Sequence, residues 1–436
     1  MTKPQLESLL VALSLIVMIS IAIGMIQHPF NYILAQPTVA QPTVLKDANL
    51  KVELFVQGLR SPTSMAFLGP NDILVLEKAD GTVRRITNGT IQQQPLLQVP
   101  VSSTSERGML GIAVAKHNNN GPPYVFLYYT QAAAAGGGTQ GTLSNVLYRY
   151  ELVNDQLVNP KLLLNLPALR GPNHNGGKVV IGPDNNVYTV IGDLRTHRTQ
   201  AQNVADGPPA DGTGGILRVT QDGQAAPNPP LGQSTTPLNL YYAYGIRNSF
   251  GIGFDPVTGN LWDTENGPTF GDEINLVEPG FNSGWVQVQG VWTPEGAIGK
   301  EAPAAGPINS NPSNLVDFGG KGKYRAPEFT WFKPVAPTAL KFYNSAKLGK
   351  QYQNDMFVGD YKYGNLYHFK LNPSRTGLVL NGTLANKIAN TVKDSQPVIF
   401  ASGFDGGITD IQVGPEDGYL YILTLAGSIY RIVPSS

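Results

Sequence analysis

The sequence predicts an all-β fold: a six-bladed β-propeller preceded by an N-terminal signal or membrane-anchor helix. Three observations lead to this prediction. From about Leu50 onward, short apolar runs alternate with clusters of Gly, Pro, Asn and Asp, and helical periodicity is scarce. A strand-turn-strand pattern recurs along the chain. The N-terminal residues, in contrast, contain one long apolar run.

That run makes the N-terminal residues a candidate targeting segment. The stretch MTKPQLESLLVALSLIVMISIAIGMIQHPF carries Lys3 and is apolar over most positions from Leu9 to Ile26. This approaches the roughly 20 apolar residues that span a bilayer. We therefore expect residues 1–30 to be a signal peptide or N-terminal membrane anchor and residues 31–49 to be a linker. The protein would be extracytoplasmic, secreted or anchored by this transmembrane helix, and would meet the membrane only there.

Residues 50–436 carry a weak internal repeat that predicts the propeller. Each copy contains a turn built on Pro with Asp or Asn and then an apolar strand. The copies are FLGPNDILVLEKADGTVRRI from Phe67, VIGPDNNVYTVIGD from Val180, GFDPVTGNLWDTENG from Gly253 and QVGPEDGYLYILTLAGSIYRI from Gln412. About 385 residues divided by roughly 45 to 65 per blade gives six to eight blades, and the long blades favour six.

Composition narrows the class of ligand. The chain has 31 basic and 31 acidic residues and no cysteine. Nucleic-acid binding is disfavoured because it needs a clustered positive surface, and no run of Lys or Arg is present. Phosphate-loop, zinc-ligand and Gly-x-Ser-x-Gly motifs are also missing from the sequence. Small neutral ligands are the better expectation.

The first candidate site is His174 in GPNHNGGKVVIGPDNNVYTVIGD, where the chain turns before an apolar strand that ends at Asp193. A histidine that acts as a base needs an acceptor on its second ring nitrogen, which fixes the tautomer and stabilises the imidazolium. Asp193 is the candidate acceptor. The alternative is a loop histidine that caps a turn.

Two further motifs are polar and rich in turns. Arg247 and Asn248 lie between glycines in YAYGIRNSFGIGFDP, and Arg presents a planar fork of donors suited to a carboxylate or a developing oxyanion. The arginine could instead pin its loop to a neighbouring blade. The stretch DTENGPTFGDEINLVEPGFNSGW offers carboxylates and backbone carbonyls, which are the ligands calcium prefers, although these groups could equally cap turns.

Together with ERGMLGIAV and FVGDYKYGNLYHFKL, these motifs resemble the soluble quinoprotein glucose and aldose sugar dehydrogenases, the glucose/sorbosone dehydrogenase family. The resemblance runs from about Leu54 to Val433. It implies a six-bladed propeller that binds pyrroloquinoline quinone (PQQ) and calcium at the top of its central funnel. It also implies oxidation of an aldose at C1 to the lactone by hydride transfer to the quinone. An external electron acceptor, such as a quinone, a cytochrome or a dye, would reoxidise the cofactor.

The resemblance assigns roles by motif. His174 corresponds to the catalytic base, Asp193 to the carboxylate that orients it, and Arg247 to the residue that stabilises charge growing on the quinone oxygen. The remaining correspondences are Asn248, which contacts the cofactor with Arg247; Lys362, which meets a cofactor carboxylate; Gly267 and Pro268, whose carbonyls ligate the calcium; and Glu106, which replaces a glutamine near the sugar. His174, Arg247 and Lys362 are then expected to point into one axial funnel.

The chain departs from the family at an Arg-x-Arg-Asp motif that grips the cofactor. The corresponding stretch is GGITDIQVGP, in which Gly407 and Thr409 replace the two arginines and only Asp410 remains. Each charge-assisted contact to the tricarboxylate cofactor is worth roughly 1.5 to 3 kcal/mol, so their loss weakens binding.

Two other functions stay open because of this departure. One is a calcium-dependent lactonase or hydrolase that uses His174 and the acidic turn without a quinone. The other is a non-catalytic extracellular propeller that binds carbohydrate or protein, for which Trp285, Trp292 and Trp331 are candidates for an exposed aromatic patch.

Overall fold

The computed structural model describes residues 43–116, 121–132, 143–233, 237–293, 296–297 and 312–435, which all belong to the compact unit Pro42–Ser436. The predicted signal or anchor helix of residues 1–30 lies outside the described residues. Within the described ranges, no helix has the length and apolarity needed to cross a bilayer.

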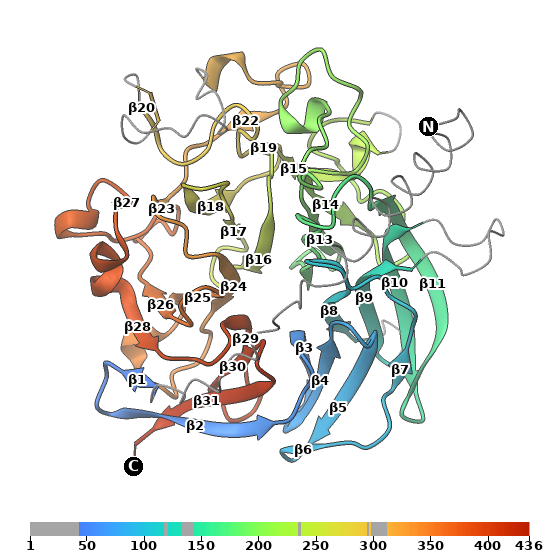
Figure 1. Ribbon diagram of the computed structural model, residues 1–436, viewed down its shortest axis with the longest axis vertical. Coiled ribbons are helices and arrows are strands. Elements are labelled where there is room, and N and C mark those ends of the chain that lie inside the picture. The colour runs from blue at the N-terminus through green and yellow to red at the C-terminus, as the bar shows by residue number, and fades with distance from the viewer. Residues whose placement is uncertain are drawn as a thin grey trace, which may run out of the picture. The chain divides into compact units, whose positions relative to one another are not determined.

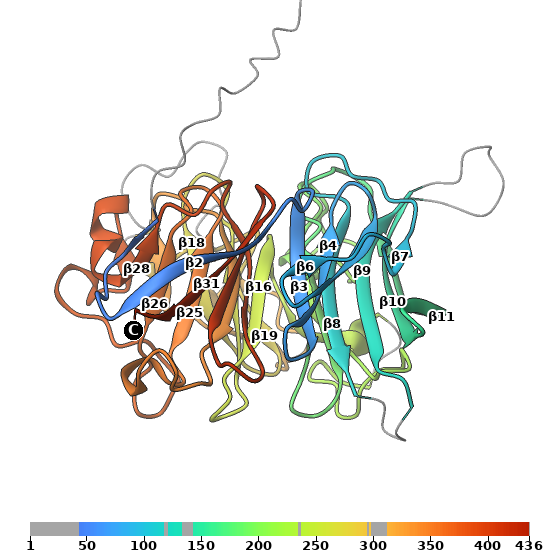
Figure 2. The ribbon, with the colours of Figure 1, turned by 90° about the horizontal axis from the view of Figure 1, so that it is seen from below.

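The unit is a ring of β-sheets around one axis, seen down the axis in Figure 1 and edge on in Figure 2. Five sheets, named here blades 1 to 5, follow one another along the chain. Blade 1 contains β3 (Pro62–Gly69), β4 (Asp72–Glu77), β5 (Thr82–Thr87), β6 (Thr90–Ile91) and β7 (Leu97–Gln98). Blade 2 contains β8 (Met109–Ala115), β9 (Tyr124–Gln131), β10 (Ser144–Val153) and β11 (Gln156–Pro167).

The next three blades add short outer strands from distant parts of the chain. Blade 3 contains β12 (Val179–Ile181), β13 (Val187–Ile191), β14 (Gly215–Val219) and β15 (Tyr241–Tyr244), extended by the parallel strands β19 (Phe281–Asn282) and β22 (Lys323–Tyr324). Blade 4 contains β16 (Ser249–Phe254), β17 (Leu261–Glu265), β18 (Asp272–Val277), β23 (Phe329–Trp331) and the parallel β27 (Ile388–Ala389). Blade 5 contains β24 (Pro337–Phe342), β25 (Met356–Asp360), β26 (Leu366–Phe369), β28 (Ile399–Ser402) and β1 (Val44–Leu45).

The remaining large sheet, named here the closing sheet, joins the two ends of the described chain. It contains β2 (Leu50–Gln57) from the start and β29 (Ile408–Val413), β30 (Leu420–Thr424) and β31 (Ser428–Pro434) from the end. β2 runs antiparallel to β31, with Leu50 opposite Pro434 and Gln57 opposite Ser428.

The prediction of six blades repeated along the chain is therefore wrong, since five blades are built in chain order and the closing sheet is a composite. Dividing length by a period assumes equal, contiguous units. The chain instead assembles the closing sheet from its two ends and lengthens blades 3 to 5 with distant strands.

Shorter elements complete the described chain. β20 (Trp292–Thr293) and β21 (Gly296–Ala297) form a two-stranded ribbon. The helical elements are 3-10 turns: η1 (Gln200–Gln202), η2 (Leu238–Leu240), η3 (Pro312–Asn314), η4 (Lys350–Tyr352), η5 (Gly382–Leu384) and η6 (Val392–Val398).

The repeat seen in the sequence has a physical basis. In each copy the turn contains a residue with positive φ, and the strand that follows it is almost wholly buried. These residues are Asn71 before β4, Asn185 before β13, Gly259 before β17 and Gly418 before β30. Asn and Gly adopt the left-handed region most readily, so they permit the tight reversal. The apolar runs are long because each such strand is covered on both faces by the neighbouring sheets.

The innermost strands surround a central channel that contains two cavities. One cavity of about 410 Å³ and another of about 660 Å³ are both lined by residues of these strands and both include Lys178, which lies directly before β12. The Lys178 ammonium lies 2.5 Å from Oδ1 of Asp410 and donates to the Ser64 hydroxyl. This buried ion pair marks the boundary between the two cavities.

Lys341 on β24 lines the smaller cavity and donates to Oε1 of Gln412 at 2.8 Å. Burial and repulsion by Lys178 lower the pKa of Lys341 from 10.5 to about 8, against an opposing effect of Asp410. Between these values the unfolded chain keeps a proton that the folded protein has lost, so the free energy of unfolding rises with pH.

We expect Lys341→Met to remove this pH dependence. Relative to the variant, the wild type should gain about 1–2 kcal/mol in the free energy of unfolding between about pH 8 and pH 9.5, measured by urea denaturation. Lys347→Met, at an exposed lysine, is the control and should parallel the wild type. Equal pH slopes for the wild type and Lys341→Met would contradict the expectation.

Candidate active site

The larger cavity lies where the inner strands of all the sheets begin. One residue at or beside the start of each innermost strand lines it: Thr63, Leu110, Lys178, Phe250, Thr338 and Thr409. Most of the residues predicted as functional line it too: Glu106, His174, Arg247, Asn248, Gly267 and Pro268. Residues far apart in sequence thus meet at one chamber on the axis.

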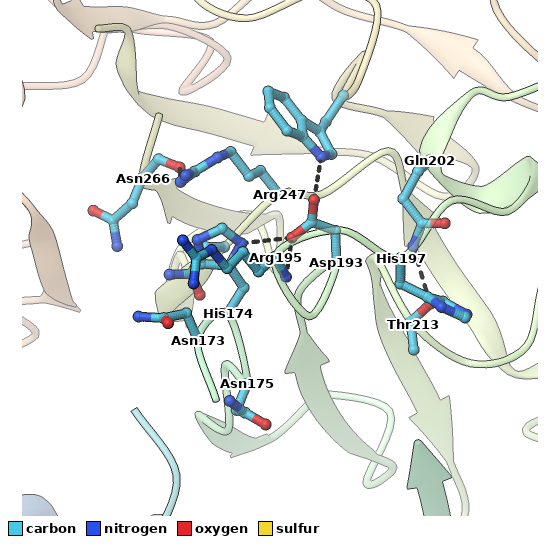
Figure 3. A network of polar contacts seen from close by, with 12 residues as sticks. Asn173, His174, Asn175, Asp193, Arg195, His197, Gln202, Thr213, Arg247 and Asn266 are labelled. Atoms are coloured by element: carbon cyan, nitrogen blue, oxygen red, sulfur yellow. Dashed lines mark hydrogen bonds and ion pairs between the residues drawn. The ribbon is translucent and has the colours of Figure 1, made fainter. Parts of the chain in front are cut away.

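His174 is held in a constrained loop beside Asp193. Its φ is 62°, and a side chain at Gly192 would place a Cβ 2.7 Å from the His174 carbonyl oxygen, so this close approach requires glycine. Nδ1 of His174 lies 2.5 Å from Oδ1 of Asp193 (Figure 3). Because Asp193 engages Nδ1, Nε2 is the nitrogen that His174 can offer to a ligand in the cavity.

Asp193 is fully buried and stays ionised because many donors surround it. Oδ1 also accepts the Arg195 amide at 2.8 Å, while Oδ2 accepts Nη1 of Arg198 and Nε1 of Trp285, both at 2.7 Å. Burial alone would raise the pKa of Asp193, but the contacts with His174, Arg198 and Trp285 outweigh it and lower that pKa.

The roles of Arg198 and Trp285 are not predicted by the sequence. Trp285 and Trp331, expected as members of an exposed aromatic patch, are 5% and 1% exposed. Trp292 begins β20, and its side chain lies outside what the structure describes. The described tryptophans therefore serve the interior, and nothing in the sequence near Asp193 signals its distant indole partner.

Glu106 connects three parts of the site. Its carboxylate accepts the His174 backbone amide at 2.5 Å, Nδ2 of Asn248 at 3.2 Å and Nδ2 of Asn173 at 3.3 Å. Glu106 therefore positions the histidine loop as well as lining the cavity. This positioning role adds to the contact with substrate that the family resemblance implies for Glu106.

Arg247 lies against the turn predicted to hold calcium. Its Nη1 donates to the carbonyl of Asn266, which lies beside it in Figure 3, at 2.7 Å. It also donates to the Gly267 carbonyl at 2.9 Å. Burial lowers the pKa of Arg247, and the surrounding carboxylates, with Asp193 and Glu265 foremost, oppose this effect. The guanidinium thus occupies one of the two carbonyls assigned to the metal.

Lys362 does not point into the cavity as predicted, and the two positions where related motifs carry arginine have different surroundings from one another. Lys362 is exposed, does not line the cavity, and donates to the Pro334 carbonyl at 3.1 Å. Gly407 has φ +82°, and a Cβ there would lie 2.1 Å from the Tyr361 carbonyl oxygen, so this backbone has no room for an arginine. Thr409 lines the cavity and bonds weakly to the Leu423 carbonyl at 3.4 Å.

Carboxylates do not converge on a metal position within the part of the chain that the structure describes. No cluster of three or more His, Cys, Asp or Glu side chains has the geometry to hold an ion there. The several converging carboxylates required by a calcium-dependent hydrolase are therefore not found among these residues.

Comparison with known proteins gives a consistent result. A family model described as Glucose / Sorbosone dehydrogenase matches residues 59–431. Aldose sugar dehydrogenase YliI of Escherichia coli is 26% identical over 393 residues, 89% of this chain and 94% of that protein. Quinoprotein glucose dehydrogenase B of Acinetobacter calcoaceticus is 25% identical over 452 residues, covering 90% and 89%.

Solved structures show the same architecture. A putative oxidoreductase (glucose dehydrogenase) from Thermus thermophilus superposes with a TM-score of 0.66 at 26% identity, over 88% of this chain and 100% of that one. The PQQ-bound form of an aldose sugar dehydrogenase from Streptomyces coelicolor gives 0.62 at 23% identity, covering 89% and 99%.

The donors around Asp193 predict the cost of neutralising it. Asp193→Asn should lower the free energy of unfolding by about 2–4 kcal/mol, because an amide cannot accept from His174, Arg195, Arg198 and Trp285 together. Urea denaturation at neutral pH measures the change. Asp206→Asn, at an exposed carboxylate, is the matched control and should change stability little. Equal stability of the two variants would refute the conclusion that Asp193 is an ionised carboxylate stabilised by these four donors.

Proposed function

The chain belongs to the glucose/sorbosone dehydrogenase family, and from this premise we propose that it is a quinoprotein that oxidises an aldose at C1 to the lactone, with His174 as general base. The observation that carries the proposal is the His174–Asp193 pair at the wall of a cavity that Arg247 and Asn248 also line. Family membership and the relatives' names support an oxidoreductase that acts on sugars.

The residues of the cavity fit an anionic, polar cofactor. PQQ is a planar tricarboxylate, and a chamber of about 660 Å³ lined by Arg247, Lys78 and Asn248 offers donors to it. Three buried polar atoms beside the cavity have no hydrogen-bond partner among the described residues: Nε of Arg247, Oδ1 of Asn248 and Oδ1 of Asn266. Such orphaned atoms are rare in native interiors and are satisfied when a polar ligand or water arrives.

In the proposed reaction, Nε2 of His174 accepts the proton of the C1 hydroxyl while the C1–H bond breaks with its electron pair. PQQ, when bound, supplies the two-electron acceptor for that hydride. Asp193 holds His174 in the tautomer with Nε2 unprotonated and stabilises the imidazolium that forms. C1 gains a second bond to its oxygen, and the aldose becomes the lactone.

Arg247 and Glu106 are proposed to position the reactants. Arg247 would face the growing negative charge on the quinone oxygen, where a buried guanidinium is most effective. Glu106 holds the amide of His174 and retains lone pairs that can accept a sugar hydroxyl. Asn248, which donates to Glu106, is proposed as a cofactor contact through its free Oδ1.

Calcium at the Gly267 and Pro268 carbonyls is part of the proposal. Arg247 donates to the Gly267 carbonyl, so a calcium ion held there would either share that oxygen with the guanidinium or displace it. Asp272 supports the turn by accepting the Gly267 amide at 2.8 Å. Lys362, which donates to the Pro334 carbonyl and keeps two further donors, is proposed as a second contact to the cofactor.

We further propose that the enzyme works outside the cytoplasm and passes electrons to an external acceptor. The apolar run from Leu9 to Ile26 supports export, and a reduced cofactor needs an acceptor before the next turnover.

The test is direct titration of the purified protein with PQQ and calcium, followed by an aldose panel with a dye acceptor. We expect sugar-dependent dye reduction. His174→Ala should lower kcat at least 10²-fold, since a positioned base contributes about 10²–10⁴, while cofactor affinity stays within about threefold.

His368→Ala is the control, because His368 pairs with Asp355 at 2.8 Å on blade 5 and does not line the cavity. It should keep wild-type kcat. Failure of the wild type to bind PQQ, or wild-type kcat in His174→Ala, would overturn the proposed function.

A further inference from the structure

One side of the cavity lacks the positive charge that a tricarboxylate ligand needs. At positions 407 and 409, where related motifs carry two arginines, this chain has Gly407 and Thr409. Asp410, which remains, is bound by Lys178 and the Ser64 hydroxyl. The carboxylates of the cofactor therefore need a different cation on this side of the chamber.

Three cationic residues line the cavity: Lys78, Lys178 and Arg247. Lys178 is not available as a free charge. Its ammonium is 2.5 Å from Asp410, and both side chains are almost fully buried, so the pair is close to neutral as seen from the chamber. Arg247 lies between blades 3 and 4 and serves that side only.

Lys78 is fixed at the cavity by its backbone and its stem. It directly follows β4 of blade 1, its amide donates to the Ser61 carbonyl, and its carbonyl accepts the Met109 amide at 3.0 Å. Its aliphatic stem passes over Gly108, where an added Cβ would lie 2.7 Å from Cγ of Lys78. Because residue 108 is glycine, the Lys78 side chain has space to extend past it and bring its ammonium to the chamber.

The ammonium of Lys78 is the least neutralised of the lysines that line the cavity. Nζ donates to the Ser103 carbonyl at 3.0 Å, and within the described residues no carboxylate lies at ion-pair distance from it. An ammonium has three donors, so two remain for a ligand. Burial lowers the pKa of Lys78, and the nearby charge of Glu106 opposes this effect, which indicates a partly desolvated cation.

The position of Lys78 in the ring matches the missing charge. β29, which carries Thr409, packs beside β3 of blade 1 (Figure 1), and Thr63 of β3 lines the same cavity as Thr409 and Lys78. We propose that Lys78 binds a carboxylate of the quinone cofactor and supplies the positive charge that Gly407 and Thr409 do not. Lys78 and Arg247 then hold the anion from two sides. This inference rests on the proposed function.

The experiment measures the Kd for PQQ in the presence of calcium and without sugar, at two salt concentrations. Quenching of tryptophan fluorescence reports the binding. Lys78→Met should raise the Kd about 10- to 100-fold and flatten its dependence on salt, because one charge-assisted contact is lost. Lys78→Arg should stay within about fivefold of wild type. Lys370→Met, an exposed lysine outside the cavity, should bind as wild type does.

Thermal melting of the cofactor-free proteins separates binding from folding. Lys78→Met should melt within a few degrees of wild type, since its ammonium makes a single neutral contact. Lys78→Gln provides a second neutral variant and should weaken binding to the same extent.

The outcomes distinguish the two proposals. Wild-type affinity in both Lys78→Met and Lys78→Gln, while the wild type binds PQQ, overturns the role of Lys78 and leaves the proposed function standing. No binding by the wild type overturns both.

Discussion

The pairing of β2 with β31 is the constraint on which the site depends. This antiparallel ladder, from Leu50 opposite Pro434 to Gln57 opposite Ser428, unites the two ends of the described chain in one sheet. Only a closed ring directs every innermost strand toward the same axis, so that the loops before those strands meet in one chamber. Glu106, His174 and Arg247 come from three different loops, yet all three line that chamber. Closure of the ring therefore holds residues from separate loops in fixed positions around one site.

Around the chamber, the surroundings of each buried carboxyl decide its charge. Asp193 receives charged and indole donors, and its pKa falls despite complete burial. Among the described residues, Glu265 accepts two hydrogen bonds, from the Arg247 amide and the Ser283 hydroxyl. Burial outweighs them and raises the pKa of Glu265 to about 7. Asp272, with three backbone amides, is intermediate at about 6. Asp193 therefore keeps its negative charge directly behind His174 throughout the pH range in which Glu265 and Asp272 titrate.

Features that depend on neighbouring residues were predictable from the sequence, and features that depend on distant parts of the chain were not. Strand positions followed from apolar runs and from turns such as Asn185 before β13, because local sterics and burial determine both. The His174–Asp193 pair was predictable because one short hairpin separates them. The composite closing sheet was not, since no repeat period signals pairing between residues at opposite ends of a chain. The roles of Trp285 and Lys78 were not predictable for a related reason: Trp285 follows β19, which joins blade 3 from a distant part of the chain, and Lys78 comes from blade 1.

The same reasoning explains why the loss of two arginines need not abolish an anion site in such a ring. A position on an innermost strand is one of many that border the axis, so a cation from a neighbouring blade can reach the same ligand group. The backbone at Gly407 excludes a side chain, whereas the glycine at 108 opens a path for Lys78. Arg247 donates a hydrogen bond to the Gly267 carbonyl, the same oxygen that is proposed to ligate a metal ion. If the chamber binds calcium and the anionic cofactor, the Gly267 carbonyl would serve the metal ion, and Arg247 and Lys78 would supply positive charge to the cofactor carboxylates.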